Sequence, residues 1–279
     1  MKSKMKKILL LAGLLANQQL LAVSEKTAWQ EEYEFDRGVT PRLVVDNVWG
    51  DVKVSAHAGN TVIVAVRETR NARDDETLER SRDLLYLDVL QTADALELVV
   101  DGINRRNNGW RECRGCRLEL EFDIQVPESA NLEVSTVNDG QVFVTGVHGQ
   151  VNARNINGDV TVEGLHHCGI FKTINGEIDV GFEKAPEGDC SFKTINGDIT
   201  ARLPKNAGAD LNLDLGHGTI SSDFELAPLA LPATIEKSPS RQGGTRYRIA
   251  KATGLRLGRG GASMKFESLN GDIEINQNH

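Results

Sequence analysis

Residues 173–178 read Thr173-Ile174-Asn175-Gly176-Glu177-Ile178, and residues 194–199 read Thr194-Ile195-Asn196-Gly197-Asp198-Ile199. Further copies of this Asn-Gly-acid tripeptide, some of them degenerate, are Asn138-Asp139-Gly140, Asn157-Gly158-Asp159, His217-Gly218-Thr219 and Asn270-Gly271-Asp272. The first five glycines are spaced by 18, 18, 21 and 21 residues, and the last follows after 53. A near-constant period of this length is typical of an array of stacked repeats.

The residues on both sides of each Asn-Gly pair alternate between apolar and polar. The positions four before the Asn, or before His217, hold Val134, Ala153, Phe171, Phe192, Leu213 and Phe266. The positions two after the Gly hold Val142, Val160, Ile178, Ile199, Ile220 and Ile273. A period of two predicts two short strands per repeat, each with one buried face. Because Asn and Gly tolerate a positive φ, we expect them to form the corner between the strands.

Two all-β architectures are compatible with this pattern. Asn-Gly between alternating runs is also a strong hairpin signal, and a chain of hairpins would build a β-sandwich. The near-constant period, with like residues at like positions in every copy, favours a parallel β-solenoid with coils of 18–21 residues, because each repeat is too small to bury its own face.

The same pattern occurs once upstream, around Trp49-Gly50-Asp51. Between this copy and the array, the predicted elements are strands at 61–67, 85–91, 96–101 and 117–126 and a short helix at 74–84 that Asp74 or Asp75 caps. We therefore divide the exported chain into an irregular β-rich part of the solenoid (23–128) and the regular Asn-Gly array (129–279). A Pro- and Gly-rich insertion is expected at about 227–261.

The motifs at 173–178 and 194–199, and the closing stretch from Gly260-Gly261 to Ile273, resemble the bacterial putative-adhesin β-strand-repeat family. The resemblance covers about residues 43–276. It implies a repetitive β fold in an exported protein, and it supplies no catalytic residues, because that family has no established ones.

The N-terminus has the features of a secretory signal peptide that ends at Ala22. Four lysines within residues 1–7 precede the apolar run Ile8–Ala16, which is too short to span a bilayer. Removal of residues 1–22 lowers the formal net charge from −8 to about −12, since the segment carries four lysines and no acid. We therefore expect an exported protein, periplasmic, surface-bound or secreted, with no nucleic-acid partner and no stable membrane insertion.

Four cysteines are compatible with an oxidising compartment. Cys113 and Cys116 form a single C-x-x-C without a second pair at ligand spacing, so a structural disulfide is favoured over a redox or metal site. Cys168 and Cys190 are 22 residues apart, about one coil, so stacking could bring them within disulfide range.

The remaining polar motifs are interpreted as structural. His166, His167 and Cys168 are expected in a turn, because adjacent residues of a strand cannot all reach one ion. The acids Asp159, Glu177 and Asp198 are expected to form a solvated ladder, with calcium binding as the alternative. We predict no catalytic, cofactor or metal residues; the predicted structural turns are Asn157-Gly158, Asn175-Gly176, Asn196-Gly197 and Asn270-Gly271.

These observations favour a non-enzymatic envelope protein, adhesin-like or a scaffold, whose partner is an envelope protein or a glycan. Self-association through uncovered coil ends is a further expectation. Two other functions remain open: a β-helix protein that binds or cleaves polysaccharide, and an accessory protein of the envelope stress response. Cleavage would need paired carboxylates in one coil, and the acids instead recur at every corner.

Overall fold

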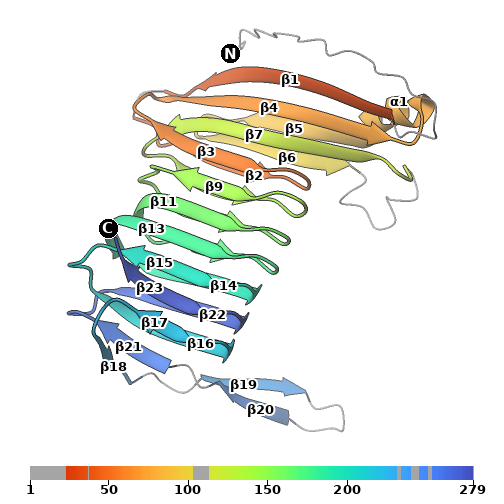
Figure 1. Cartoon of the computed structure of the whole chain (residues 1–279). Coiled ribbons are helices and arrows are strands. Elements are labelled where there is room, and N and C mark those ends of the chain that lie inside the picture. Colours follow the sequence, from red (N-terminus) through yellow and green to blue (C-terminus); the bar gives the residue numbers. More distant parts are fainter. Residues whose placement is uncertain are drawn as a thin grey trace.

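The computed structural model describes residues 23–36, 38–102, 113–230, 234–239, 245–250 and 253–278. The predicted signal peptide at 1–22 lies outside these residues. The protein is all-β, with two large, mostly parallel sheets and one small antiparallel sheet (Figure 1). Within the described residues there is one helix, α1 (Asp75–Leu84).

Sheet A has ten strands, which in spatial order are β1 (Val23–Glu34), β4 (Thr61–Ala72), β7 (Arg117–Pro127), β3 (Val52–His57), β9 (Val142–Thr145), β11 (Val160–His167), β13 (Ile178–Glu187), β15 (Ile199–Leu203), β23 (Ile273–Gln277) and β17 (Ile220–Ser222). Sheet B has eleven, namely β18 (Leu226–Pro228), β21 (Thr253–Leu257), β16 (Ala209–His217), β22 (Ala262–Asn270), β14 (Asp189–Asn196), β12 (Ile170–Lys172), β10 (Val151–Arg154), β8 (Asn131–Ser135), β2 (Arg42–Asp46), β6 (Ala95–Gly102) and β5 (Leu85–Gln91). The small sheet pairs β19 (Thr234–Pro239) with β20 (Thr245–Ala250).

Each Asn-Gly corner joins a strand of sheet B to a strand of sheet A. Strand β10, for example, leads through Asn157-Gly158 into β11, and β12 leads through Asn175-Gly176 into β13. We call such a unit (sheet B strand, corner, sheet A strand) a repeat. Neighbouring repeats pair in parallel in both sheets. The Asn-Gly corners of the array are therefore not the turns of local hairpins.

The repeats do not stack in sequence order. The upstream repeat β2–β3 lies between β6–β7 and β8–β9, because β2 pairs with both β6 and β8. The last repeat, β22–β23, lies between β14–β15 and β16–β17. The order of the repeats thus explains the interval of 53 residues before the final Asn-Gly copy. After β16–β17 the chain makes β18 to β21, and then β22–β23 inserts between β16–β17 and β14–β15.

The apolar positions identified in the sequence occupy matching places in neighbouring repeats. In sheet A, the register aligns Val142, Val160, Ile178, Ile199 and Ile273. All five are buried in one hydrophobic core. In sheet B, Phe171, Phe192 and Phe266 stack, with ring centroids 5.2 and 4.5 Å apart. Stacking of like on like lets every repeat bury its apolar face against its neighbours. Ile220, in the last repeat of sheet A, has a neighbour on one side and is 38% exposed.

Antiparallel strands extend both sheets beyond the first repeats. Strands β1 and β4 continue sheet A from β7, and β5 continues sheet B from β6. Helix α1 connects β4 to β5 and begins at Asp74, whose carboxylate accepts a hydrogen bond from the Thr77 N–H at 2.7 Å. At the other end of α1, the buried Arg70 guanidinium donates to the carbonyls of Ser81 and Leu85, both at 2.9 Å. Both ends of the helix thus have hydrogen-bond partners.

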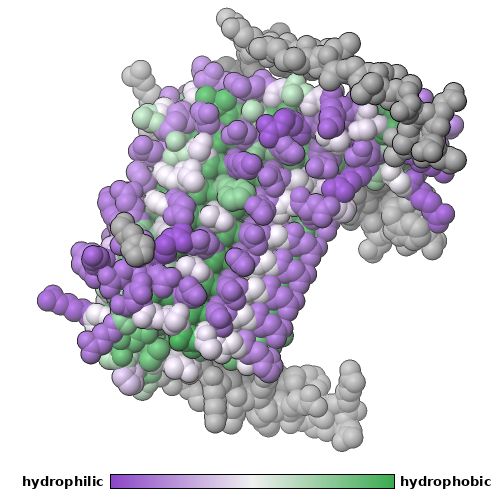
Figure 2. Space-filling view, viewed as in Figure 1, coloured by the Kyte–Doolittle hydropathy of each residue, from purple (hydrophilic) through white to green (hydrophobic). Residues whose placement is uncertain are grey.

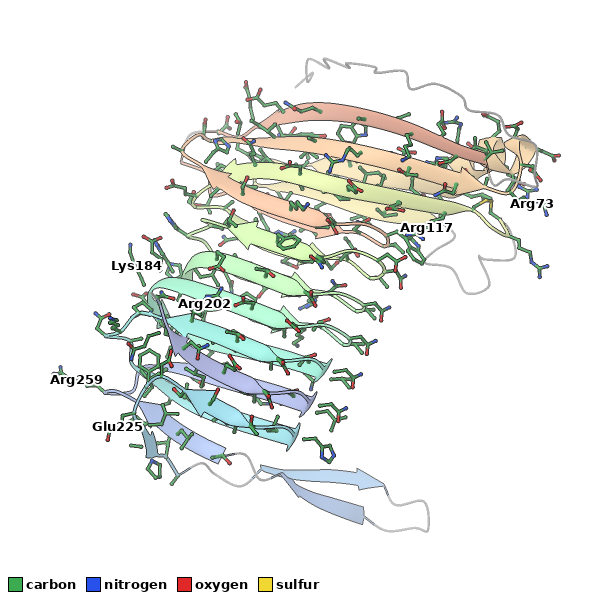
Figure 3. All side chains as sticks on the ribbon, in the orientation of Figure 1. Arg73, Arg117, Lys184, Arg202, Glu225 and Arg259 are labelled. Carbon is green, nitrogen blue, oxygen red and sulfur yellow. A yellow bond between two sulfur atoms is a disulfide. The ribbon has the colours of Figure 1, made fainter. Side chains whose placement is uncertain are left out.

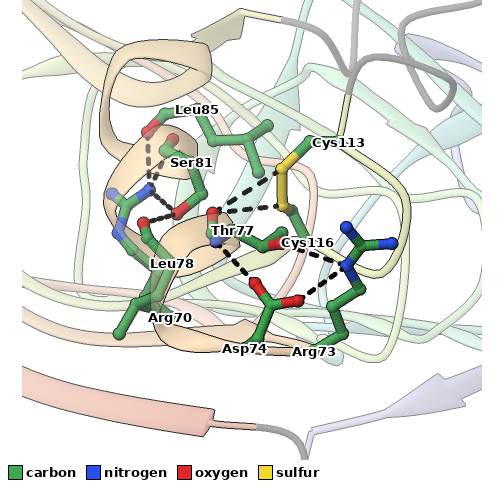
Figure 4. Close-up of a disulfide and its surroundings, with 9 residues drawn as sticks. All are labelled: Arg70, Arg73, Asp74, Thr77, Leu78, Ser81, Leu85, Cys113 and Cys116. Carbon is green, nitrogen blue, oxygen red and sulfur yellow. Dashed lines mark hydrogen bonds and ion pairs between the residues drawn. A yellow bond between two sulfur atoms is a disulfide. The ribbon is translucent and has the colours of Figure 1, made fainter.

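The Cys113–Cys116 disulfide lies against helix α1 (Figure 4). The two sulfurs are 3.9 and 3.8 Å from the Thr77 carbonyl oxygen. The bridge therefore packs the segment just before β7 against the helix. The sequence also predicts that this disulfide clasps the loop at 104–112, which lies outside the described residues.

The far end of sheet B is covered by two further strands. Strand β21 pairs antiparallel with β16, and β18 pairs with β21. Arg256 of β21 donates to both carboxylate oxygens of Asp210 of β16, at 2.7 and 2.8 Å. The insertion predicted at about 227–261 includes β19, β20 and β21, and β21 lies between β16 and the edge strand β18 in sheet B.

The corners bring backbones unusually close together. A Cβ on Gly176 would overlap the carbonyl oxygen of Gly158, and one on Gly197 would overlap that of Gly176. Gly197 also has a φ of 145°, whereas Gly176 has no positive φ. The corner glycines therefore do not all need a positive φ. They share another requirement, which is that no side chain fits beside the neighbouring carbonyl.

The corners do not require a positive φ at their Asn residues, although Asn tolerates it. Among the described residues, Asp139 is the one non-glycine residue with a positive φ, at 48°. Asn157, Asn175, Asn196 and Asn270 stay in ordinary backbone conformations. The amide side chain, described below, explains the preference for Asn at these positions.

We predict that Gly176→Ala lowers the free energy of unfolding by about 2–4 kcal/mol, because the two backbones must move apart to admit the methyl group. Gly181→Ala is the matched control. A Cβ there meets the carboxylate end of Glu163, which can rotate away. Urea denaturation of both variants measures the difference, and equal stability of the two would contradict the close-packing explanation.

Candidate functional site

The corner edge is the most regular surface of the molecule and our candidate site. We define it as the corner residues of the stacked repeats from Asn138 to Asn270. In the space-filling view, like-coloured residues form columns that run along the stack (Figure 2). Three rows of side chains, each with one residue per repeat, line this edge, and aspartates that follow the corners make further contacts between repeats.

The first row is a ladder of asparagine amides. The Asn157 amide nitrogen donates to the Asn138 oxygen at 3.1 Å, and Asn175 donates to Asn157 at 2.8 Å. Asn196 and Asn270 continue the ladder, donating to Asn175 and Asn196 at 2.8 and 2.9 Å. An amide has both a donor and an acceptor, so each interior Asn gives one hydrogen bond and receives another.

A second row, of buried polar side chains, lies just inside the ladder. Thr173 donates to the Gly158 carbonyl at 2.9 Å, and Thr194 donates to the Gly176 carbonyl at 3.1 Å. The other members of this row are Thr136, Asn155 and Ser268, each of which donates to a corner glycine carbonyl of the adjacent repeat. This row binds the carbonyls that the close approach of the glycines removes from water.

The acids after the corners are hydrogen-bonded to the backbone. Asp159 accepts the Glu177 N–H at 2.8 Å, and Asp198 accepts the Asp272 N–H at 2.7 Å. Asp51 and Asp272 accept N–H groups of the next repeat in the same way. These aspartates thus connect consecutive repeats, and the structure assigns them a use beyond the solvated ladder that we expected.

The third row is aliphatic and exposed. Ile156, Ile174 and Ile195 are 39, 39 and 37% exposed, and Leu269 is 52% exposed. They immediately precede the Asn of each corner, so they form a stripe parallel to the amide ladder. The stripe therefore runs beside amides that are hydrogen-bonded to one another through one N–H group each, with their second N–H group left over.

The structure brings the predicted corner residues together along one edge, but two of the three rows were missed. The signal for both rows is present in the sequence as the repeated Thr-Ile before Asn-Gly. Alternation of apolar and polar residues predicts an apolar residue at each buried position, but the buried Thr173 and Thr194 are polar. The sequence pattern alone assigned no role to the Ile position.

The second disulfide lies near the opposite edge. Cys168 and Cys190 are bonded, with their Cα atoms 4.7 Å apart. The bridge joins the segment after β11 to β14. The expectation that His166 and His167 form a turn is wrong, because both belong to the end of strand β11. Their contacts are described in the last subsection.

The outer face of sheet B has a shallow depression. Its lining includes Val44, Asp46, Glu133, Asn152 and Arg154, and its volume is about 130 Å³. Small-molecule sites usually enclose about 300–1,000 Å³. This depression is therefore too small to hold a substrate of ordinary size.

Ion pairs across neighbouring strands cover the outer faces. In sheet A, Arg202 contacts Glu163 and Asp179 (Figure 3). In sheet B, Glu267 lies between Lys193, at 2.8 Å, and Lys265. Burial raises the pKa of Glu267, but hydrogen bonds and charge from the two lysines outweigh burial, and the net pKa lies below its ordinary value.

Among the described residues, the helix is neither long nor apolar enough to cross a bilayer.

No protein-family model and no curated protein matches the chain. Similar solved structures include a putative cell adhesion protein from Clostridium sporogenes, with 10% identity and a TM-score of 0.40 over 91% of this chain and 100% of that one. A putative adhesin from Bacteroides fragilis has 11% identity and a TM-score of 0.33 over 89% and 96%. The structural neighbours are thus described as adhesins, like the family that the repeats resemble. At these identities and TM-scores the likeness carries no argument about function.

We predict that Asn175→Asp destabilises the protein at neutral pH by about 1 kcal/mol, since a carboxylate cannot donate to Asn157. Asn131→Asp is the control, because the Asn131 oxygen accepts the Gln150 N–H and a carboxylate keeps that bond. Thermal unfolding at pH 7 compares the two. Equal melting temperatures would show that the ladder contributes no stability.

The lowered pKa of Glu267 predicts a pH dependence. A carboxyl whose pKa is lower in the folded state stabilises the fold above its unfolded value, near 4.3, and loses this contribution as pH falls through the folded pKa. Glu267→Gln should therefore be less stable than wild type at pH 7, and the difference should vanish by about pH 3. A difference that is constant with pH would contradict the assignment.

Proposed function

We propose that the protein is an exported, non-enzymatic β-solenoid that serves as an adhesin-like or scaffold module and binds a protein partner through its corner edge. The observation that carries the proposal is the exposed aliphatic stripe of Ile156, Ile174, Ile195 and Leu269 beside a hydrogen-bonded amide ladder. Exposed apolar residues in a contiguous row, unlike scattered ones, are typical of interaction surfaces.

The side chains on the surface support a protein partner over a glycan. Sugar-binding faces commonly offer exposed aromatic rings. Here the Trp49 ring is covered by the Arg117 guanidinium, 4.1 Å from the ring centroid, and the Phe residues of sheet B are buried. The exposed Tyr86 lies on β5, outside the corner edge. An aliphatic stripe of regular spacing instead fits the apolar side chains of a polypeptide.

Two features support an exported location. The basic and apolar N-terminal segment has the pattern of a signal peptide. The two disulfides use all four cysteines, as is typical of proteins that fold in an oxidising compartment.

The proposal is tested with the triple variant Ile156→Thr/Ile174→Thr/Ile195→Thr, which retains β-branched residues and removes apolar surface. Labelled protein should bind intact cells or envelope of the producing bacterium, and the variant should bind at least tenfold more weakly. The control is Val89→Thr/Leu90→Thr, which removes exposed apolar side chains on β5. Melting temperatures verify that all proteins are folded.

Two further measurements can overturn the proposal. Binding that survives protease treatment of the envelope but not oxidation of its sugars would replace the protein partner with a glycan. Release of reducing sugars from a panel of polysaccharides would contradict the absence of enzymatic activity.

A further inference from the structure

A cluster of metal-ligating side chains lies outside the corner edge, where the chain returns from sheet A to sheet B. His148 follows β9, His166 is near the end of β11, and Glu183 is in β13. The three residues belong to three consecutive repeats, and the parallel register places them side by side. The cluster takes no part in the interaction surface proposed above.

The donor atoms converge. The Nε2 atom of His166 is 3.2 Å from Oε2 of Glu183, and the Nε2 atom of His148 is 3.9 Å from the same oxygen. Ligand atoms from all three residues lie within 4.8 Å of one another. Two ligands of a tetrahedral zinc ion are about 3.4 Å apart, given bond lengths of about 2.0–2.2 Å. Shifts of less than about 1 Å would therefore make room for an ion.

The two imidazole rings are stacked, with centroids 3.9 Å apart and planes 6° from parallel. Parallel stacked rings do not direct both Nε2 atoms at one point, so binding of a shared ion requires one ring to turn about χ2. The side chains are 35% exposed at His148, 14% at His166 and 60% at Glu183, so an ion can enter from solvent.

A fourth residue, Glu128, lies beside the other nitrogen of His148. Oε2 of Glu128 lies 3.7 Å from Nδ1 of His148, on the opposite side of the ring from Glu183. A carboxylate on the second nitrogen of a metal-binding histidine fixes its tautomer and raises its basicity. The His148 N–H also donates to the Glu128 carbonyl at 2.7 Å, so the backbones of the two residues are held together.

The backbone beneath the cluster is well anchored. Each of the three ligands directly follows a buried apolar residue, namely Val147, Leu165 and Phe182. The Cys168–Cys190 disulfide lies two residues beyond His166. A site on such a support needs little reorganisation when an ion binds.

We propose that His148, His166 and Glu183 form a binding site for a divalent transition-metal ion of the zinc class, with Glu128 as the residue that positions His148. Two imidazoles and one carboxylate are a ligand set that suits zinc and neighbouring transition metals, and they leave the fourth position for water. Calcium and magnesium prefer all-oxygen sites, so they should bind poorly here.

The test uses the full chain, expressed for export, purified without a histidine tag and freed of metal with its disulfides intact. Calorimetric titration at pH 7.5 should show one equivalent of Zn²⁺ bound with micromolar or tighter affinity. Binding should weaken at pH 5, because protons compete for the imidazole nitrogens. Zn²⁺ should raise the melting temperature, and Co²⁺ should give the visible absorption of a tetrahedral site.

The variant His148→Ala/His166→Ala should lose at least tenfold in Zn²⁺ affinity and lose the cobalt spectrum. His167→Ala is the matched control: this exposed neighbour lies outside the cluster, and its variant should bind like wild type. Unchanged binding by the double variant, or no binding by wild type, overturns the proposal and leaves the four residues as ion pairs alone. Glu128→Gln should weaken binding by less than the double variant does.

Discussion

Close backbone contact at the corners is the constraint on which the rest of the structure depends. Each corner glycine approaches the carbonyl of the glycine in the adjacent repeat so closely that no side chain fits between them. That approach buries a carbonyl, which Thr173 or its equivalents then satisfy. It also aligns the Asn amides for hydrogen bonding and the Asp carboxylates for the next N–H. Each residue of the Thr-x-Asn-Gly-Asp motif, apart from x, therefore allows or follows from the close approach of two corner backbones.

Much of the fold could be predicted from the sequence because apolar periodicity reports directly on buried faces. The positions of Val160, Ile178 and Ile199 were assigned to one column, and the register aligns them. Helix α1 and its cap at Asp74 were likewise predicted, since a charged run after an Asp is a local signal. These features depend on neighbours a few residues apart, where the sequence is most informative.

Features that depend on which repeats are neighbours could not be predicted. Nothing in the sequence states that β22 lies between β14 and β16, because all repeats present similar edges. The cluster of His148, His166 and Glu183 was missed for a related reason. The sequence offered His166 and His167 as an adjacent pair, whereas the residues that meet are 18 and 17 positions apart. The amide ladder was not predicted, because Asn is common in turns and its presence at a corner does not by itself indicate hydrogen bonds between repeats.

The insertion of β22–β23 between two earlier repeats also constrains the order in which the stack can form. Strand β22 pairs with both β14 and β16, yet it follows both of them in the sequence. Until it arrives, β16–β17 has no parallel partner in either sheet. Residues 262–277 therefore join two parts of the stack that do not pair with each other directly. Loss of this one repeat would leave unpaired strands on both sides of the gap, in both sheets, so it would disrupt the stack more than loss of a repeat at its end.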